Sequence, residues 1–354
     1  MPIQQSQTHA TLTTPEIVHG YPRSNLIKGI RLDLTSRRTD AFGSDIWPIT
    51  WADDDHQYSG FGDGAGFGAV DYKEQYGPHR VSLGVARIEG DPDTYKGINV
   101  WGGKNHENLA QFTGKSTGII CINGILYKFW AGPESNTVPE TRIAVSYDHS
   151  KTWHLQEWKW TMQDRLFAGT FINFGKNNAG AKDDYAYALF SRLAQIPEEP
   201  RNWQYEVPGQ VDLARVPNNQ ILEKDAYEWF CGIDQNGQPL WSSNVQDRQP
   251  TFEDPTGIKI VSCSHHAQSD RFLLSYSFRD TNGTFGLFEA QNPWGPWHVV
   301  SYVENFDTFK PPEPCHRVCT FHFAPKWWRN NGNTFTMVFN VADDSWNTIH
   351  GELL

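Results

Sequence analysis

Apolar and polar stretches alternate along the chain in a pattern that recurs five times. Each unit has an apolar run, then an aromatic-rich segment, and then a further segment that leads into a polar turn. Short segments of this kind, rich in aromatic and β-branched residues and bounded by turn residues, predict β-strands. In chain order, the predicted strands of the five units are residues 46–51, 56–61 and 81–89; 117–122, 125–130 and 142–147; 167–174, 184–190 and 211–216; 258–263, 271–278 and 285–290; and 318–323, 334–340 and 347–354.

The weak similarity among these units predicts an all-β chain that repeats small antiparallel sheets around an axis. This architecture is a β-propeller, here with five blades of four-stranded antiparallel sheets. A predicted strand over residues 25–34 precedes the first unit and could complete the last one, which would close the ring and remove exposed strand edges. A sandwich with long loops is the competing architecture, and the regular order of the strands favours the propeller. Residues 21–354 are expected to form this single domain, after a flexible polar leader over residues 1–20.

The composition agrees with strands and argues against several classes of partner. Aromatic residues make up 14% of the chain and charged residues only 20%, a balance that favours strands over helices. The net charge is −11 and the chain has no run of Lys and Arg, which argues against a nucleic-acid partner. No apolar run approaches the roughly 18 residues of a membrane-spanning helix. Neither a nucleic acid nor a membrane is therefore expected as a partner, and a monomer is expected.

The ends of the chain and its cysteines bear on where the protein works. Residues 1–16 have neither a basic start nor an apolar core, so no signal peptide is expected in the chain as given. An extracellular or periplasmic location would follow if a leader had been removed. The cysteines are odd in number, which favours buried thiols over a disulfide framework; they are Cys121, Cys231, Cys263, Cys315 and Cys319. Cys315, His316 and Cys319, with His322, have the side chains of a zinc site but not its spacing.

The first place to look for chemistry is the acidic stretch over residues 43–67, which contains five aspartates. Asp45 stands just ahead of the first predicted strand, and Asp63 lies between two glycines at the end of the second. If these strands are neighbours, the two carboxylates can meet at one edge of the sheet. Two carboxylates that flank a bond are the minimum equipment for glycoside hydrolysis. The alternative is that Asp63 only caps a strand, while residues 53–55 form a polar turn.

Lys115 lies among small residues ahead of the apolar run of the second unit. Its surroundings lack the glycine spacing of a phosphate-binding loop. At the inner end of a blade, this lysine could bind a substrate oxygen or lower the pKa of a neighbouring carboxyl group. The competing interpretation is a solvated loop lysine.

A second dense polar cluster follows the first strand of the third unit. Asn173, Lys176 and Asp184 offer the donors and acceptors that sugar hydroxyls need. The same residues could instead close a loop with their own hydrogen bonds. Asn177, Asp183 and Asp184 could also hold a hard cation such as calcium through oxygen. No spacing rule supports that cation, so neither a cofactor nor a metal site is predicted.

Histidines and tryptophans supply the remaining candidates. His79 with Arg80 suits β-elimination from a uronic acid, since arginine can neutralise the carboxylate while histidine takes the proton. His265 could take the same role, although each of these histidines could also be structural. Trp47 and Trp130 lie near the presumed mouth of the ring and could stack on sugar rings. Most of the 15 Trp are nevertheless expected to pack between blades.

One short motif supports the propeller. The segment Ser146-x-Asp148-x-Ser150-x-Thr152-Trp153 resembles the Asp box of sialidases and related propellers, with Ser150 in place of a glycine. In that motif the aspartate and hydroxyls hold a strand-to-strand turn, and the tryptophan packs between blades. The motif therefore indicates a fold and not a catalytic role.

Several longer segments resemble one family of five-bladed propellers, long catalogued as a domain of unknown function, which includes glycoside hydrolases that cleave D-arabinan. The resemblance covers residues 42–354 and rests on the acidic stretch with GKSTGIICINGILYKFW, FINFGKNNAGAKDDYAY, LARVPNNQILEKDAYEWFCGID, NPWGPW and FAPKWW. It implies that two aspartates of the first blade carry catalysis, one before the first strand and one in a Gly-Asp-Thr motif after the second. Asp45 and Asp63 match these places, but Gly64 replaces the threonine, which bears on the substrate.

Together these observations predict a glycoside hydrolase that acts on a polysaccharide or oligosaccharide, furanosides included, with Asp45 and Asp63 as its catalytic pair. The glycan would be bound by the polar and aromatic residues named above, which are Lys115, Asn173, Lys176, Asp184, His79, Arg80, His265, Trp47 and Trp130. A polysaccharide lyase is the first alternative, and a carbohydrate-binding propeller without turnover is the second.

Overall fold

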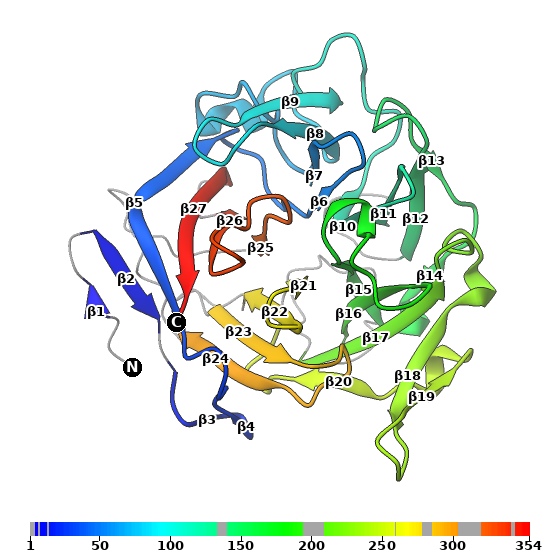
Figure 1. Cartoon of the computed structure of the whole chain (residues 1–354). Helices are drawn as coiled ribbons and strands as arrows, with labels where there is room; N and C mark the ends of the chain where they lie inside the picture. The colour runs from blue at the N-terminus through cyan, green and yellow to red at the C-terminus, as the bar shows by residue number, and fades with distance from the viewer. Residues whose placement is uncertain are drawn as a thin grey trace.

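The computed structural model describes residues 4–5, 8–12, 14–132, 140–193, 209–258, 260–277, 285–303, 320–340 and 344–354. Its strands form curled sheets arranged around a central axis (Figure 1). The first sheet along the chain consists of β6 (Ile49–Trp51), β7 (Gln57–Phe61), β8 (Gly84–Glu89) and β9 (Lys96–Trp101) in that order. The second consists of β10 (Lys115–Ile122), β11 (Ile125–Gly132), β12 (Glu140–Ser146), β13 (His154–Leu155) and β14 (Trp160–Thr161).

The largest sheet contains two antiparallel runs of strands joined by a short parallel pairing of β15 with β21. One run consists of β15 (Leu166–Asn173), β16 (Tyr185–Arg192), β17 (Gln210–Pro217), β18 (Glu228–Ile233), β19 (Pro239–Ser242) and β20 (Pro250–Glu253). The other consists of β21 (Ile260–His266), β22 (Arg271–Ser277), β23 (Phe285–Ala290) and β24 (His298–Val303). Among the described residues the helices are short 3-10 turns: η1 (Tyr72–Tyr76), η2 (Met162–Asp164), η3 (Lys176–Asn178), η4 (Lys224–Ala226) and η5 (Val245–Asp247). None of these is long and apolar enough to cross a membrane.

The last sheet joins both ends of the chain. Its order is β1 (Gln4–Gln5), β2 (His9–Leu12), β5 (Ile30–Asp40), β27 (Trp346–Leu353), β26 (Thr334–Asn340) and β25 (Thr320–Phe323). A separate hairpin of β3 (Ile17–Val18) and β4 (Tyr21–Pro22) lies between β2 and β5 in the chain. The segment expected as a loose leader is therefore partly structured: Ala10 is 0% exposed and Leu12 is 1% exposed, because these apolar side chains pack as β2 pairs with β5.

The predicted strands are present with shifted ends, and most outermost strands were not predicted. Within the described residues, β9, β13 and β24 add a further strand to their sheets. β9 is mostly half-exposed or exposed, so its sequence lacks the continuous apolar signal of the inner strands. The first strand begins at Ile49 and not at Ile46, because Ile46 has a φ of 54° that takes it out of extended backbone. A hairpin of β18 and β19 surrounds Gly237.

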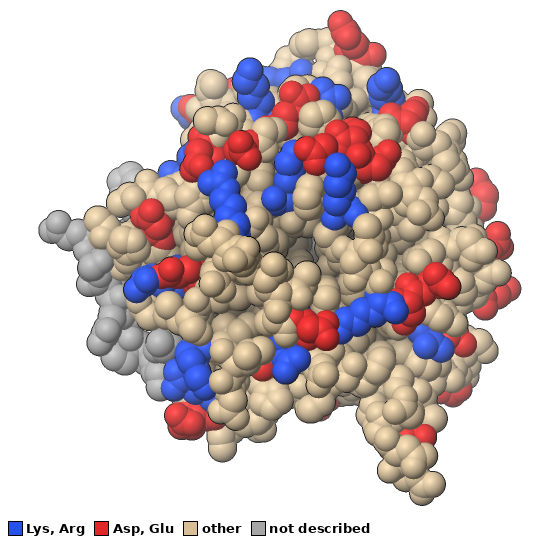
Figure 2. All heavy atoms as spheres, in the orientation of Figure 1, with Lys and Arg blue, Asp and Glu red and all other residues tan. Residues whose placement is uncertain are grey.

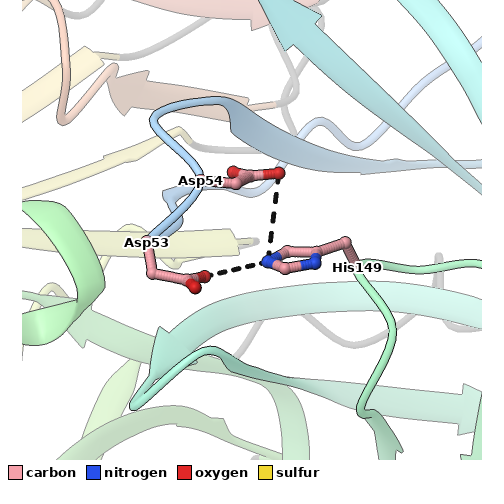
Figure 3. A group of neighbouring side chains, drawn as sticks. All are labelled: Asp53, Asp54 and His149. Carbon is pink, nitrogen blue, oxygen red and sulfur yellow. Dashed lines mark hydrogen bonds and ion pairs between the residues drawn. The ribbon is translucent and has the colours of Figure 1, made fainter.

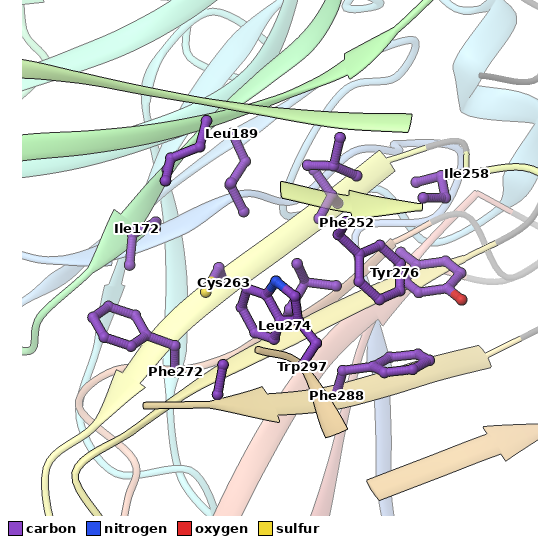
Figure 4. Packing of buried hydrophobic residues seen from close by; sticks show 14 of the residues in the cluster. Ile172, Leu189, Phe252, Ile258, Cys263, Phe272, Leu274, Tyr276, Phe288 and Trp297 are labelled. Carbon is purple, nitrogen blue, oxygen red and sulfur yellow. The ribbon is translucent and has the colours of Figure 1, made fainter. Parts of the chain in front are cut away.

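Large apolar side chains fill the space between neighbouring runs of strands. One cluster joins Ile172 and Leu189, from β15 and β16, to Leu274 and Phe288, from β22 and β23 (Figure 4). Several of the tryptophans expected to pack between blades are fully buried, among them Trp47, Trp101, Trp229, Trp327 and Trp346. Cys121 and Cys263 are buried free thiols and Cys231 is a half-buried one. Cys315, His316 and Cys319 lie outside the described residues.

Candidate active site

Asp45 and Asp63 lie at the same end of the β6–β7 hairpin. Asp45 and Gly62 form an antiparallel bridge beyond the two strands, with both backbone hydrogen bonds at 2.9 Å. The chain then turns at Asp63, whose φ of 57° lies in the left-handed region, which aspartate adopts more readily than most residues. The bridge therefore holds the two carboxylate-bearing residues at one edge of the sheet, as the strand order predicts.

Gly62 allows charged groups to approach each other closely. A Cβ at this position would lie 3.0 Å from both Asp45 Oδ1 and Lys115 Nζ. It would also lie 2.9 Å from the carbonyl oxygen of Ser82. Any side chain at position 62 would thus displace the carboxylate and the ammonium that meet above it.

Lys115 brings the second sheet into the site. It is the first residue of β10, and its Nζ lies 2.5 Å from Asp63 Oδ2 and 3.8 Å from Asp45 Oδ1. These two carboxylate oxygens are therefore at most about 6.3 Å apart, the sum of 2.5 and 3.8 Å. The Lys115 side chain is 3% exposed, against 16% for Asp45 and 27% for Asp63. A ligand can thus reach the carboxylates, while the ammonium supports them from below.

Arg80 contacts the same pair from the connection between β7 and β8. Its guanidinium donates to Asp63 Oδ1 at 2.8 Å, so each oxygen of Asp63 has a cationic partner. His79 is half-buried, and its ring meets the ring of His106 edge to face at 4.6 Å. The structure therefore gathers Lys115 and Arg80 beside the aspartates, and the arginine of the expected lyase pair is bonded to Asp63.

Trp47 and Trp130 do not face a ligand. Trp47 is 0% exposed and packs against Phe61, Phe67 and Trp346, with ring centroids 5.1 to 5.7 Å away. Trp130 is 4% exposed, and its indole N–H donates to the carbonyl of Thr113 at 2.7 Å. Stacking of these two rings on sugars was therefore a wrong expectation, because protein atoms already enclose both.

The other predicted glycan-binding residues lie at the opposite end of the strands. They are Asn173 at the end of β15, Lys176 in η3, Asp184 directly before β16, and His265 in β21. The strand β10 relates the two ends, because it begins at Lys115 and runs toward Gly124, whose N–H donates to Asn177 Oδ1 at 2.8 Å. The sequence clusters thus separate into two sites, one at each end of the inner strands.

The polar turn between β6 and β7 belongs to this opposite end and is bonded to distant parts of the chain. His149 Nε2 lies 2.9 Å from Asp53 Oδ1 and 3.9 Å from Asp54 Oδ2 (Figure 3). Asp55 pairs with Lys326 at 2.8 Å and with Lys176 at 3.0 Å. The hydrogen bond from Lys326, followed by the one from Lys176, lowers the pKa of the Asp55 carboxyl. Acidic and basic side chains accordingly gather over the part of the face that holds β6, β7 and β8 (Figure 2).

Two groups of residues have side chains of the types that bind cations. The three residues in Figure 3 place their ligand atoms within 4.8 Å of one another, but hydrogen bonding between histidine and carboxylate already occupies them. Of the residues that the sequence suggests for calcium, Asn177 Oδ1 accepts from the backbone of Gly124. Asp183 Oδ2 accepts from the hydroxyl of Tyr187 at 2.7 Å. These oxygens thus have separate partners.

The turn between β12 and β13 is held by its own polar side chains. Asp148 Oδ1 accepts from Ser146 Oγ and from the backbone N–H of Thr152, both at 2.9 Å. Ser150 has a φ of 70°, the left-handed conformation that favours the glycine of the motif it resembles. Trp153 is 5% exposed. This turn contributes to the fold, and its aspartate is bonded within the turn.

Solved structures share this fold at low sequence identity. A Bacteroides ovatus protein assigned as a hydrolase matches with a TM-score of 0.56 and 11% identity, over 96% of each chain. The catalytic domain of a Coprinopsis cinerea GH62 alpha-L-arabinofuranosidase matches with a TM-score of 0.51 and 8% identity, over 98% of this chain and 96% of that one. A GH43_1 enzyme from Xanthomonas citri matches with a TM-score of 0.50 and 13% identity, over 91% of this chain and 92% of that one.

Sequence comparisons add no closer relative. No protein-family profile matches the chain, and no curated protein matches its sequence. The structural likeness alone shows that the chain has the β-propeller type of fold found in GH43 and GH62 glycoside hydrolases.

Proposed function

We propose that this chain is a glycoside hydrolase and that Asp45 and Asp63 are its catalytic pair. One observation carries the proposal: carboxylates from adjacent strands reach the same buried ammonium, that of Lys115, while remaining partly exposed themselves. Glycoside hydrolysis requires such a pair on either side of the scissile bond. The fold shared with GH43 and GH62 enzymes supports the assignment.

We take the sheets as the five blades of a closed propeller. The two runs β15–β20 and β21–β24 are separate blades in contact through their innermost strands. The pairing of β5 with β27 completes the blade of β25, β26 and β27 and closes the ring. Closure fixes the innermost strands relative to one another, which is why residues of neighbouring blades, Asp45 and Lys115, can share one site.

The contacts favour different roles for the two aspartates. Asp63 faces two cations, Arg80 and Lys115, which support the anion that a nucleophile needs. Asp45 has a longer contact to Lys115 and is the less exposed carboxylate, which suits a group that must carry a proton. Asp63 would attack the anomeric carbon as the glycosidic C–O bond breaks and Asp45 protonates the leaving oxygen. Asp45 would then take a proton from water, whose oxygen displaces Asp63 from the anomeric carbon.

This mechanism predicts that the configuration of the sugar is retained. Asp45 Oδ1 and Asp63 Oδ2 are at most about 6.3 Å apart, below the roughly 6.5–9.5 Å between carboxyl groups that leaves room for water in inverting enzymes. Proton NMR of the first-formed reducing sugar will show whether its anomer matches the substrate. An inverted first product would exclude Asp63 as a nucleophile.

We propose a pentose-containing glycan as the substrate. The structures that share the fold include an arabinofuranosidase and a β-xylosidase, the latter with a TM-score of 0.50 at 12% identity over 88% of this chain and 94% of that one. Gly64, where the resembling family has a threonine, leaves no open space: a Cβ there would lie 2.3 Å from the carbonyl oxygen of Gly43, so the expected room beside Asp63 is not present. Assays therefore begin with arabinans and xylans and then extend to other plant, algal and microbial-wall polysaccharides.

The decisive experiment tests Asp45→Asn and Asp63→Asn separately on any glycan that the unmodified chain cleaves. Each change is expected to lower kcat by about 10²–10⁴-fold, the contribution typical of a positioned acid or base. Asp225→Asn, at an exposed aspartate in η4, is the matched control and should retain full activity. Near-normal turnover by either active-site variant would contradict the assignment.

The same substrate panel separates hydrolysis from elimination. Arg80 is bonded to Asp63, so the structure gives no specific support to a uronate site built on His79 and Arg80. Products are therefore measured both as new reducing ends and by the ultraviolet absorbance of unsaturated uronates. Unsaturated products would assign a lyase instead.

A further inference from the structure

A second cavity lies at the opposite end of the strands from Asp45 and Asp63. Its volume is about 310 Å³, within the roughly 300–1,000 Å³ of small-molecule sites. The ends of three inner strands contribute to it, namely β6, β15 and β21, together with the segment that follows β25. It is therefore placed at the axis of the fold, which is hollowed on the face in Figure 2.

Two tryptophans give the cavity flat apolar walls. Trp328 is fixed by Phe323, stacked at 5.2 Å, and by His266, whose ring centroid lies 4.6 Å away. Trp51 donates its indole N–H to Asp55 at 3.1 Å, which fixes the orientation of that ring. Both indoles are only half-buried and line the cavity. Partly exposed, immobilised indole faces are the surfaces on which sugar rings stack.

Polar side chains between these walls are available to hydrogen-bond a ligand. Asn173 Oδ1 is shielded from solvent and has no hydrogen-bond partner among the described residues. A buried amide oxygen without a partner costs free energy, and a rotation of this half-buried side chain would offer the oxygen to a ligand hydroxyl. Ser264, Gln268 and Asn331 add a hydroxyl and two amides to the lining. Such a set can both donate to and accept from a polyol.

The charged groups around the cavity are already neutralised by one another. Arg329, which lines it, pairs with Asp93 at 3.0 Å. His265 pairs with Asp270 at 2.9 Å, and Lys182 pairs with the same aspartate at 2.6 Å. A charged ligand would have to compete with these pairs, whereas an uncharged one leaves them intact.

We propose that this cavity binds one neutral sugar residue, the end or a side branch of a glycan, at a site separate from Asp45 and Asp63. The indole walls match the ring of the sugar and the amides match its hydroxyls, while the paired charges disfavour uronates and phosphates. The inference stands on the cavity itself and does not require that the chain hydrolyse the glycan. Asn173 and His265, which the sequence suggested for glycan binding, would serve this site.

The test uses the full chain carrying Asp45→Asn and Asp63→Asn, so that a bound sugar is not turned over. Binding of L-arabinose, D-arabinose, D-xylose and xylotriose is measured by saturation-transfer NMR and by titration of tryptophan fluorescence. Adding Trp328→Ala is expected to weaken binding about tenfold, the free energy of one aromatic contact. Adding Asn173→Asp, which keeps the shape and introduces a charge, should weaken it similarly.

Controls separate this site from the aspartate pair. Tyr147→Ala removes an aromatic residue that is 59% exposed and lies outside the cavity, and it should leave affinity unchanged. Gln268→Ala, an exposed lining position, gives a milder variant if Trp328→Ala unfolds. Absence of binding at millimolar sugar, or affinity that survives the cavity changes but is lost with Lys115→Met, would overturn the proposal. Hydrolysis is assayed independently on the chain with intact aspartates, so either proposal can fail alone.

Discussion

Lys115 sets the charge balance of the proposed catalytic pair. Its Nζ touches Asp63 at 2.5 Å and lies 3.8 Å from Asp45. Two carboxylates so close to each other would repel each other without this cation. The sequence placed this lysine in the second unit, ahead of its apolar run, but it could not show that the side chain reaches across to the aspartates of the first.

Replacing this lysine should impair turnover. In Lys115→Met, kcat/KM is expected to fall by about 10²-fold, because the ammonium that contacts both carboxylates no longer positions them. Lys115→Arg should restore part of the activity. Steady-state kinetics and urea unfolding of both variants test this. A Met variant that unfolds more readily but keeps kcat/KM would show that Lys115 only supports the fold.

Lys128 is a fully buried lysine. Its side chain is 0% exposed, and its Nζ lies 4.2 Å from the ring of Trp101 and 4.0 Å from that of Trp153. Burial holds the pKa of this ammonium well below its ordinary value. A desolvated cation gains about 2 kcal/mol from such a ring, but desolvation costs several kcal/mol and is the cause that lowers the pKa here.

Stability should therefore depend on pH through Lys128. The unfolded chain binds a proton here below about pH 10.4, the ordinary lysine pKa, so the penalty on the folded state grows as pH falls from that value. Lys128→Met is expected to be more stable than the unmodified chain at pH 7, with a difference that shrinks toward pH 10. Urea unfolding at several pH values measures this difference in the free energy of unfolding. Lys151→Met, at an exposed lysine, is the control. A Met variant that is less stable at pH 7 would contradict this account.

At the scale of elements, hydrophobic periodicity predicted the inner strands well and the outer ones poorly. β10 and β15 are buried almost throughout, so their sequences carry continuous apolar signals. β9 is exposed or half-buried up to its last residue, the buried Trp101, so most of its sequence cannot be distinguished from that of a loop. The start of β6 was missed for another reason, since the left-handed φ of Ile46 depends on the bridge between Asp45 and Gly62.

Gly62, which follows the β6–β7 hairpin, allows a test of how closely the site is packed. Gly62→Ala would place a methyl group 3.0 Å from Asp45 Oδ1 and Lys115 Nζ. We expect kcat/KM to fall by about 10²-fold, as when a reacting group is displaced by an ångström, and stability to fall by about 1–3 kcal/mol from overpacking. Gly77→Ala, at a φ of −82° with its nearest neighbour at 3.2 Å, is the control. Equal activities for the two variants would show that close packing at Gly62 does not position the pair.

At the scale of the whole molecule, strand direction explains why the sequence grouped residues that the fold separates. The start of an inner strand and the end of the next strand lie at one end of the sheet, which is where Asp45 and Asp63 lie. Turns between the first and second strands, such as that after Asn173, lie at the other end. The order of the predicted strands indicates which residues lie at which end, whereas composition alone does not. The pairs of Asp55 with Lys176 and Lys326 could not be predicted, because they join loops far apart in the sequence.

The N-terminal segment gives the last test, because the structure pairs β2 with β5 of the last sheet. Leu12 is 1% exposed and belongs to the same core cluster as Ile30, Phe335 and Ile349, from β5, β26 and β27. Leu12→Ala is therefore expected to lower the free energy of unfolding by about 2–5 kcal/mol, the cost of a buried leucine. Ile17→Ala, at a position that is 65% exposed, should change it by less than about 0.5 kcal/mol. Chemical unfolding measures both. If the two variants were equally stable, the segment would be the loose leader that its polar sequence suggests, and β5 alone would close the last sheet.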